Sequence, residues 1–191
     1  MLAITGVMIA ITAVMSFTPL GSIPTPWATI TLAFLPTMVA AMTLGFWPAV
    51  AVGASAGIFS LIRATYVVSL LQPFMLNPLV GVVPRIMIGV VVFFVFKALI
   101  GIRVPKLVAA PISGAIGGIT NTTLVFLSIW IFYGAAANQA AYYAENDSFN
   151  SLWTFILFVL SVNGIAEVIG YTILGGAIVI GLDRARFLRK K

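Results

Sequence analysis

The sequence contains no cysteine and no histidine, and only 7% of its 191 residues are charged. Disulfides, thiol nucleophiles, imidazole bases and the usual zinc ligand sets are therefore excluded. A soluble domain carries about 25% charged residues, whereas this chain is 62% hydrophobic and has a mean hydropathy of +1.18. The composition indicates an integral membrane protein that lacks the side chains of most membrane enzymes.

Phosphate-handling motifs are also missing. The sequence has no Gly-x-x-x-x-Gly-Lys-Ser/Thr loop for ATP, and no cluster of carboxylates to hold the magnesium of a lipid phosphotransferase. No serine has a histidine to activate it, which excludes a rhomboid-like protease. We therefore expect no enzyme activity and no cofactor in this chain, and any drive from ATP must come from a partner.

What the sequence does contain is a series of apolar runs broken by glycine, proline, asparagine and charge. A membrane helix uses roughly 20 apolar residues, so residues 1–191 hold six spans as a single domain, with no room for a soluble one. Lipid leaves helices as the way to satisfy the backbone of such segments. We predict an all-α membrane protein, a compact six-helix bundle whose first helix is retained rather than cleaved as a signal. The predicted spans are 2–19, 29–45, 47–66, 85–100, 108–132 and 152–181.

Basic residues predict the orientation of these spans. Lys97, Arg103 and Lys106 surround the loop after the fourth span, and five further cations lie between Arg184 and Lys191. Cytoplasmic loops are enriched in lysine and arginine, so we predict a multi-pass protein of a bacterial cell membrane with both termini in the cytoplasm. The net charge of +6 then reflects topology rather than nucleic-acid binding.

Arg85 is the most informative residue, because it follows a proline-broken loop and enters an uncharged apolar helix. A charge at bilayer depth is costly and usually marks a binding site, and a guanidinium pairs bidentately with a carboxylate. We therefore predict an outward-facing pocket for an anionic ligand. Two alternatives are that Arg85 bonds carbonyl groups of its own loop, or that it pairs with Glu145 or Asp147.

Asn121, Asn163 and Glu167 are further strongly polar residues within predicted spans. Asn163 and Glu167 are four residues apart and share a helix face. Glu167 has two interpretations, a protonated structural carboxyl bonded to Asn121 or Asn163, or the titrating group of a small ion-coupled secondary transporter. The second interpretation gives Arg85 no role. Arg63, near the outer end of its span, is interpreted as a structural or snorkelling residue.

Small residues form stripes that permit close helix approach. Ala3, Gly6 and Ala10 form one on the first span, and Gly53 to Gly57 form another on the third. Each stripe serves either internal packing or docking onto another subunit, whereas Gly114, Gly117 and Gly118 are expected to pack internally.

Several runs together resemble a known family. They are Thr25-Pro26-Trp27-Ala28-Thr29-Ile30-Thr31-Leu32-Ala33-Phe34-Leu35-Pro36, Asn77-Pro78-Leu79-Val80 and Val83-Pro84-Arg85-Ile86-Met87-Ile88-Gly89. They resemble the substrate-binding membrane subunits, or S components, of energy-coupling factor (ECF) vitamin transporters.

This resemblance implies a six-helix S component with a vitamin pocket near the outer face. It implies as partners a transmembrane coupling subunit and two cytoplasmic ATPases, which bind the ATP and magnesium. It also implies that Ala3, Gly6 and Ala10 form the surface that docks onto the coupling subunit.

The subgroup that the runs resemble most includes pantothenate and folate carriers. Arg85 suits a carboxylate, Asn121 and Asn163 suit amide or hydroxyl groups, and Trp27 covers the top, which together favour pantothenate. Tyr66 and Asn77 complete the predicted substrate-binding set. Folate is the alternative, because aromatic residues near the outer face could form a slot for its pterin.

Overall fold

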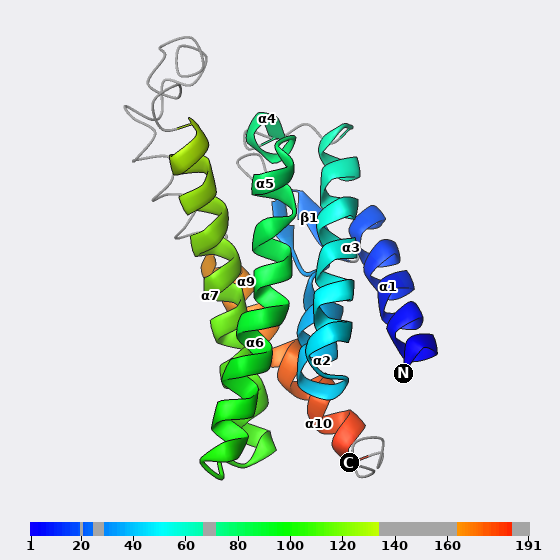
Figure 1. Ribbon diagram of the computed structural model, residues 1–191, viewed down its shortest axis with the longest axis vertical. Coiled ribbons are helices and arrows are strands. Elements are labelled where there is room, and N and C mark those ends of the chain that lie inside the picture. Colours follow the sequence, from blue (N-terminus) through cyan, green and yellow to red (C-terminus); the bar gives the residue numbers. More distant parts are fainter. Residues whose placement is uncertain (20, 25–28, 67–71, 134–163, 185–191) are drawn as a thin grey trace.

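The computed structural model describes residues 1–19, 21–24, 29–66, 72–133 and 164–184. Apolar helices dominate this part of the chain (Figure 1). In chain order the elements are α1 (Leu2–Phe17), β1 (Ser22–Pro24), β2 (Thr29–Thr31), α2 (Leu35–Thr43), α3 (Phe46–Ala64), α4 (Gln72–Met75), α5 (Pro78–Gly81), α6 (Val83–Gly101), α7 (Lys106–Tyr133), α9 (Ile165–Gly170), the π-helical turn η2 (Tyr171–Gly175) and α10 (Gly176–Arg184).

The predicted helical membrane protein is confirmed in its main features. Among the described residues, four helical segments are long and apolar enough to cross a membrane: Phe46–Ala64, Pro78–Gly101, Lys106–Phe132 and Ile165–Leu182. Helix α1 is apolar and slightly shorter, with 16 residues. These segments agree with five of the predicted spans, although the first part of the last one, 152–163, lies outside the described residues.

The predicted membrane helix over 29–45 is wrong in its first part. Thr29–Thr31 forms a short strand that pairs antiparallel with Ser22–Pro24, and helix begins only at Leu35, with Pro36 in its first turn. Nine residues of helix extend about 14 Å, less than the roughly 30 Å of a hydrocarbon core. The second predicted span is therefore a hairpin strand followed by a short helix, all of which is buried from Leu35 to Met42.

The helical segment Pro78–Gly101 is interrupted by a turn at Val82, three residues before Arg85, in the region where the prolines predict a break. Asn77 caps α5, since its side-chain Oδ1 accepts a hydrogen bond from the Leu79 N–H. Helix α5 ends at Gly81, and α6 begins at Val83. Arg85 consequently lies in the first turn of α6.

Glycines allow the closest helix contacts. A Cβ atom at Gly53 would lie 2.7 Å from the carbonyl oxygen of Arg85, and one at Gly57 would lie 2.7 Å from the Cα of Val82. The stripe on α3 therefore packs internally against the α5–α6 junction. Gly114, on α7, meets the carbonyl oxygen of Tyr171 in the same way, which confirms the internal packing predicted for that stripe.

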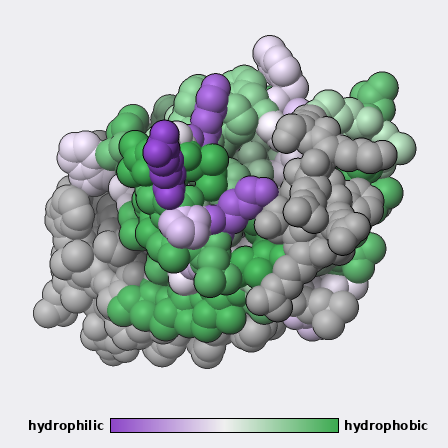
Figure 2. Space-filling view, turned by 90° about the horizontal axis from the view of Figure 1, so that it is seen from below, coloured by the Kyte–Doolittle hydropathy of each residue, from purple (hydrophilic) through white to green (hydrophobic). Residues whose placement is uncertain are grey.

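The two ends of the molecule differ. Figure 1 shows α4 and α5 at one end, and the α6–α7 turn and α10 toward the other. Lys97, Arg103 and Lys106 are exposed around the α6–α7 turn, and the view of that end in Figure 2 shows a few hydrophilic side chains among hydrophobic ones. The structure thus gathers these three cations at one end, as the predicted topology requires.

Candidate functional site

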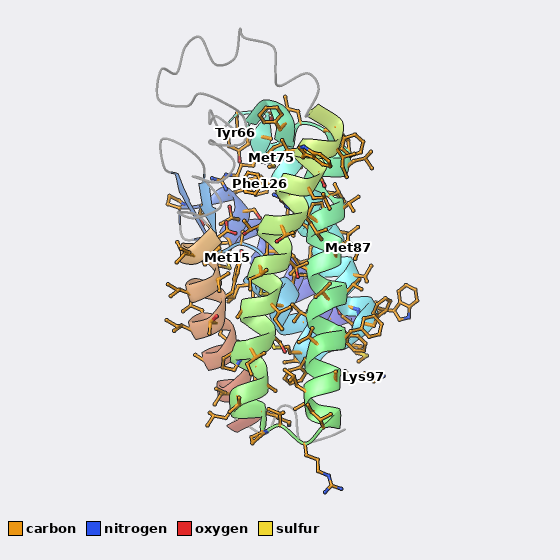
Figure 3. The ribbon with its side chains drawn as sticks, turned by 90° about the vertical axis from the view of Figure 1, so that its left-hand side faces the viewer. Met15, Tyr66, Met75, Met87, Lys97 and Phe126 are labelled. Atoms are coloured by element: carbon orange, nitrogen blue, oxygen red, sulfur yellow. The ribbon has the colours of Figure 1, made fainter. Side chains whose placement is uncertain are left out.

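Arg85 is buried, with 6% of its surface exposed. Its Nη1 donates a hydrogen bond of 2.9 Å to the carbonyl oxygen of Val80, and its Nη2 makes longer contacts of 3.4 Å to Ser60 Oγ and 3.8 Å to Met75 Sδ. The guanidinium carbon also lies 5.1 Å from the centre of the Phe34 ring, a favourable cation–π arrangement. Met75 lies at the end of the molecule that carries Tyr66 (Figure 3), so Arg85 is near the α4–α5 end.

Two features make this environment attractive to an anion. Arg85 Nε is buried and has no hydrogen-bond partner among the described residues. The first turn of a helix is also the positive end of its dipole, so the start of α6 adds to the charge of Arg85 instead of balancing it. The predicted bond to a carbonyl of its own loop is present at Val80. Glu145 and Asp147, the carboxylates of the other alternative, lie outside the described residues, within which no carboxylate bonds Arg85 directly.

A second buried group joins α7 to α9. Asn121 Nδ2 donates a hydrogen bond of 3.0 Å to Glu167 Oε2, and both residues are 5% exposed. This contact confirms the prediction that Glu167 bonds Asn121. The other amide atom, Asn121 Oδ1, is buried and has no partner among the described residues.

The same carboxylate holds the hairpin. Glu167 Oε1 accepts a hydrogen bond of 3.0 Å from the backbone N–H of Thr31. One helical turn further on, the hydroxyl of Tyr171 donates to the carbonyl oxygen of Thr31. Residue 31 is therefore held on both its backbone groups by side chains of the last helical segment, which gives Glu167 a structural role.

These groups form one candidate site. The charges of Arg85 and Glu167 interact with each other and with Tyr171, although the described residues contain no hydrogen bond between Arg85 and Glu167. Strand β2 and helices α6, α7 and α9 each contribute a polar group. The result is a buried cluster with one unpaired donor, Arg85 Nε, and one unpaired acceptor, Asn121 Oδ1.

The other predicted binding residues are placed differently. Asn77 lies at the start of α5, where its side chain caps the helix. Tyr66 is 56% exposed just after α3, at the α4–α5 end (Figure 3). Trp27 and Asn163 lie outside the described residues. The structure therefore brings together Arg85 and Asn121 from the predicted set.

Sequence reasoning missed three members of the cluster: Phe34, Thr31 and Tyr171. Phe34 was one of many aromatic residues in apolar runs, and Thr31 contributes backbone atoms, which no side-chain pattern reveals. Tyr171 did carry a signal, because it lies four residues after Glu167 and so shares its helix face.

The stripe on α1 is separate from this site. Ala3, Gly6 and Ala10 are exposed, and a Cβ atom at Gly6 would meet nothing within 4 Å. Unlike the stripes on α3 and α7, this one is exposed in the described part of the chain.

The sequence matches the family described as "ECF transporter, substrate-specific component" over residues 1–179. That match covers nearly the whole chain. The protein therefore belongs to this family of membrane subunits, which bind a transport substrate and are not themselves enzymes.

A curated relative carries a more particular name. The chain is 29% identical over 107 residues to the pantothenic acid transporter PanT of Lactococcus lactis subsp. cremoris strain MG1363. The aligned region covers 56% of this chain and 46% of the relative, so the chain spans about half the length of that protein.

Proposed function

We propose that this protein is the substrate-capture subunit of an ECF-type ABC importer, and that its substrate is pantothenate. The observation that carries the proposal is the buried Arg85 at the start of α6, whose Nε has no acceptor and whose charge has no directly bonded carboxylate in the described residues. An unpaired buried cation is strongly destabilising. A ligand carboxylate would supply the missing partner.

Pantothenate has the functional groups that the cluster lacks. Its carboxylate would pair with Arg85, and an amide N–H or a hydroxyl would donate to Asn121 Oδ1. Trp27 and Asn163 are further proposed contacts, with Tyr66 and Asn77 near the mouth of the site. The name of the Lactococcus lactis relative supports the same substrate.

Folate is the alternative substrate within the same family. It also carries carboxylates for Arg85, but its pterin needs a flat slot between aromatic rings. Tyr66 is exposed, and Trp27, another aromatic residue of the predicted slot, lies outside the described residues. Pantothenate is preferred because the name of the Lactococcus lactis relative supports it.

The proposal includes a topology and an assembly. Six spans place both termini in the cytoplasm, the α4–α5 end at the outer face and the cations around the α6–α7 turn inside. The exposed α1 stripe of Ala3, Gly6 and Ala10 docks onto a transmembrane coupling subunit, and two cytoplasmic ATPases supply the energy.

Equilibrium binding of labelled pantothenate to the purified chain in detergent, without ATP, tests the substrate. Folate, riboflavin, biotin and pyridoxine serve as competitors. Saturable binding displaced only by unlabelled pantothenate is the expected result. Displacement by another vitamin would change the cargo, and absence of binding by all of them would overturn the capture function.

A further inference from the structure

The hydrogen bonds of Glu167 determine which way the Asn121 amide points. An ionised carboxylate is only an acceptor, and here Oε1 is occupied by the Thr31 N–H and Oε2 by Asn121 Nδ2, both at 3.0 Å. In the structure Asn121 accordingly turns its N–H₂ group toward Glu167 and its oxygen away from it.

The oxygen that is turned away is the one without a partner. Asn121 is 5% exposed, and its Oδ1 is completely buried with no hydrogen-bond donor among the described residues. Arg85 Nε, in contrast, is a buried donor that has no acceptor among the described residues. Within the described residues, the cluster thus displays one acceptor and one donor without partners.

We infer that Glu167 is a specificity-determining residue, which fixes Asn121 as an acceptor so that the ligand must present an O–H or N–H group to it while its carboxylate takes Arg85. This inference rests on the proposed function, since it assumes that pantothenate binds at this cluster. Glu167 acts through Asn121 and is a positioning residue rather than a ligand contact.

The inference predicts strong discrimination between similar ligands. A buried acceptor left unpaired is costly, and sites built to bond a hydroxyl or N–H reject analogues that lack it. Removal of the one donor that faces Asn121 should weaken binding by about tenfold or more. Removal of a donor that faces elsewhere should have a smaller effect.

Glu167→Gln reverses the polarity of this arrangement. The oxygen of the introduced amide still accepts from the Thr31 N–H, so its nitrogen faces Asn121 as a donor. Asn121 must then turn its oxygen toward residue 167 and present its N–H₂ group to the ligand. The variant should lose the preference for a donor and should tolerate or prefer an acceptor at that position.

The experiment compares pantothenate with three analogues, each altered at one donor. These are the ketone at the secondary hydroxyl, the fluoride at the primary hydroxyl and the N-methyl amide. Dissociation constants are measured for the wild-type protein, Glu167→Gln, Tyr171→Phe and Asn121→Leu. Tyr171→Phe is the matched control, because it removes a hydrogen bond to Thr31 but leaves the Asn121–Glu167 bond in place.

We expect one analogue to bind the wild-type protein at least tenfold more weakly than pantothenate. In Glu167→Gln, the ratio of the dissociation constants of this analogue and pantothenate should fall to threefold or less, or should invert. Tyr171→Phe should keep the wild-type ratio. Asn121→Leu, which removes the acceptor, should lose this ratio, and this variant tests the inference even if Glu167→Gln fails to fold.

The remaining outcomes are distinguishable. If the wild-type protein binds pantothenate but the ratios are the same in Glu167→Gln, or if Asn121→Leu keeps the preference for a donor, the inference is overturned and the capture function stands. If the wild-type protein does not bind pantothenate, both fail together.

Discussion

Tyr171 and Thr31 are 140 residues apart in the chain, yet the tyrosine hydroxyl donates a hydrogen bond to the threonine carbonyl oxygen. The contact ties the hairpin of β1 and β2 to the π-helical turn that follows α9. Because Glu167 accepts from the N–H of the same residue, the hairpin is anchored to the helix that also orients Asn121.

Removal of the tyrosine hydroxyl should loosen the hairpin. Tyr171→Phe deletes one buried hydrogen bond, so we expect a loss of about 1 kcal/mol in stability. The chain contains no cysteine, so a single Ser22→Cys on β1 reports the local change through its rate of reaction with a hydrophilic maleimide. The rate should rise in Tyr171→Phe.

Ser113→Cys is the matched control for this labelling experiment. Ser113 is fully buried on α7, so its cysteine should stay unreactive in both backgrounds. Equal reactivity of Ser22→Cys with and without Tyr171→Phe would contradict the anchoring role, and reactivity at both positions would indicate global unfolding instead.

Arg85→Ala should weaken pantothenate binding by about 2–5 kcal/mol, the usual cost of truncating one partner of a buried charge pair. Arg85→Lys should recover only part of this loss, because an ammonium group lacks the planar fork of a guanidinium. Arg103→Ala removes an exposed arginine at the opposite end and should bind as the wild type does. Wild-type affinity in Arg85→Ala would remove Arg85 from the binding site.

Gly53→Ala should destabilise the protein, whereas Gly6→Ala should not. The added methyl group at Gly53 would lie 2.7 Å from a backbone oxygen that cannot rotate away, and such overpacking costs about 1–3 kcal/mol. At Gly6 it meets nothing within 4 Å and raises helix propensity by up to about 1 kcal/mol. Thermal unfolding in detergent measures both, and equal melting temperatures would contradict the close α3–α6 contact.

Gly6→Leu or Ala10→Leu should abolish uptake by cells that express the complete transporter and leave pantothenate binding to the isolated subunit unchanged. The reason is that a bulky side chain would prevent close approach of the coupling subunit. Ala51→Leu adds the same side chain to another exposed position, on α3, and should transport normally. Loss of binding in the α1 variants would instead assign the stripe to internal packing.

Composition and charge were enough to predict much of this fold. Long apolar runs identified α3, α6 and α7 because a membrane helix has few alternatives, and the prolines around Arg85 identified the break before α6. The strand at Thr29–Thr31 was missed because its apolar surroundings continue into α2, although the alternating, β-branched Thr-Ile-Thr sequence is typical of a strand.

Site residues could be predicted where the free-energy cost of placing a polar side chain in a membrane singles them out. Arg85, Asn121 and Glu167 are expensive in a membrane, and the structure places all three in one cluster. Their hydrogen bonds were harder to predict from the sequence, because Val80 and Thr31 contribute backbone groups whose positions depend on the folded hairpin and loop.

Helix α2 differs from its neighbours in having protein on every side, since each residue from Leu35 to Met42 is buried. The outward faces of α1 and α3 meet a fluid solvent that accepts almost any apolar shape, but α2 meets fixed side chains all around. A saturation mutagenesis map of the chain should therefore show α2 as its least tolerant segment, where exchanging one aliphatic residue for another is already harmful.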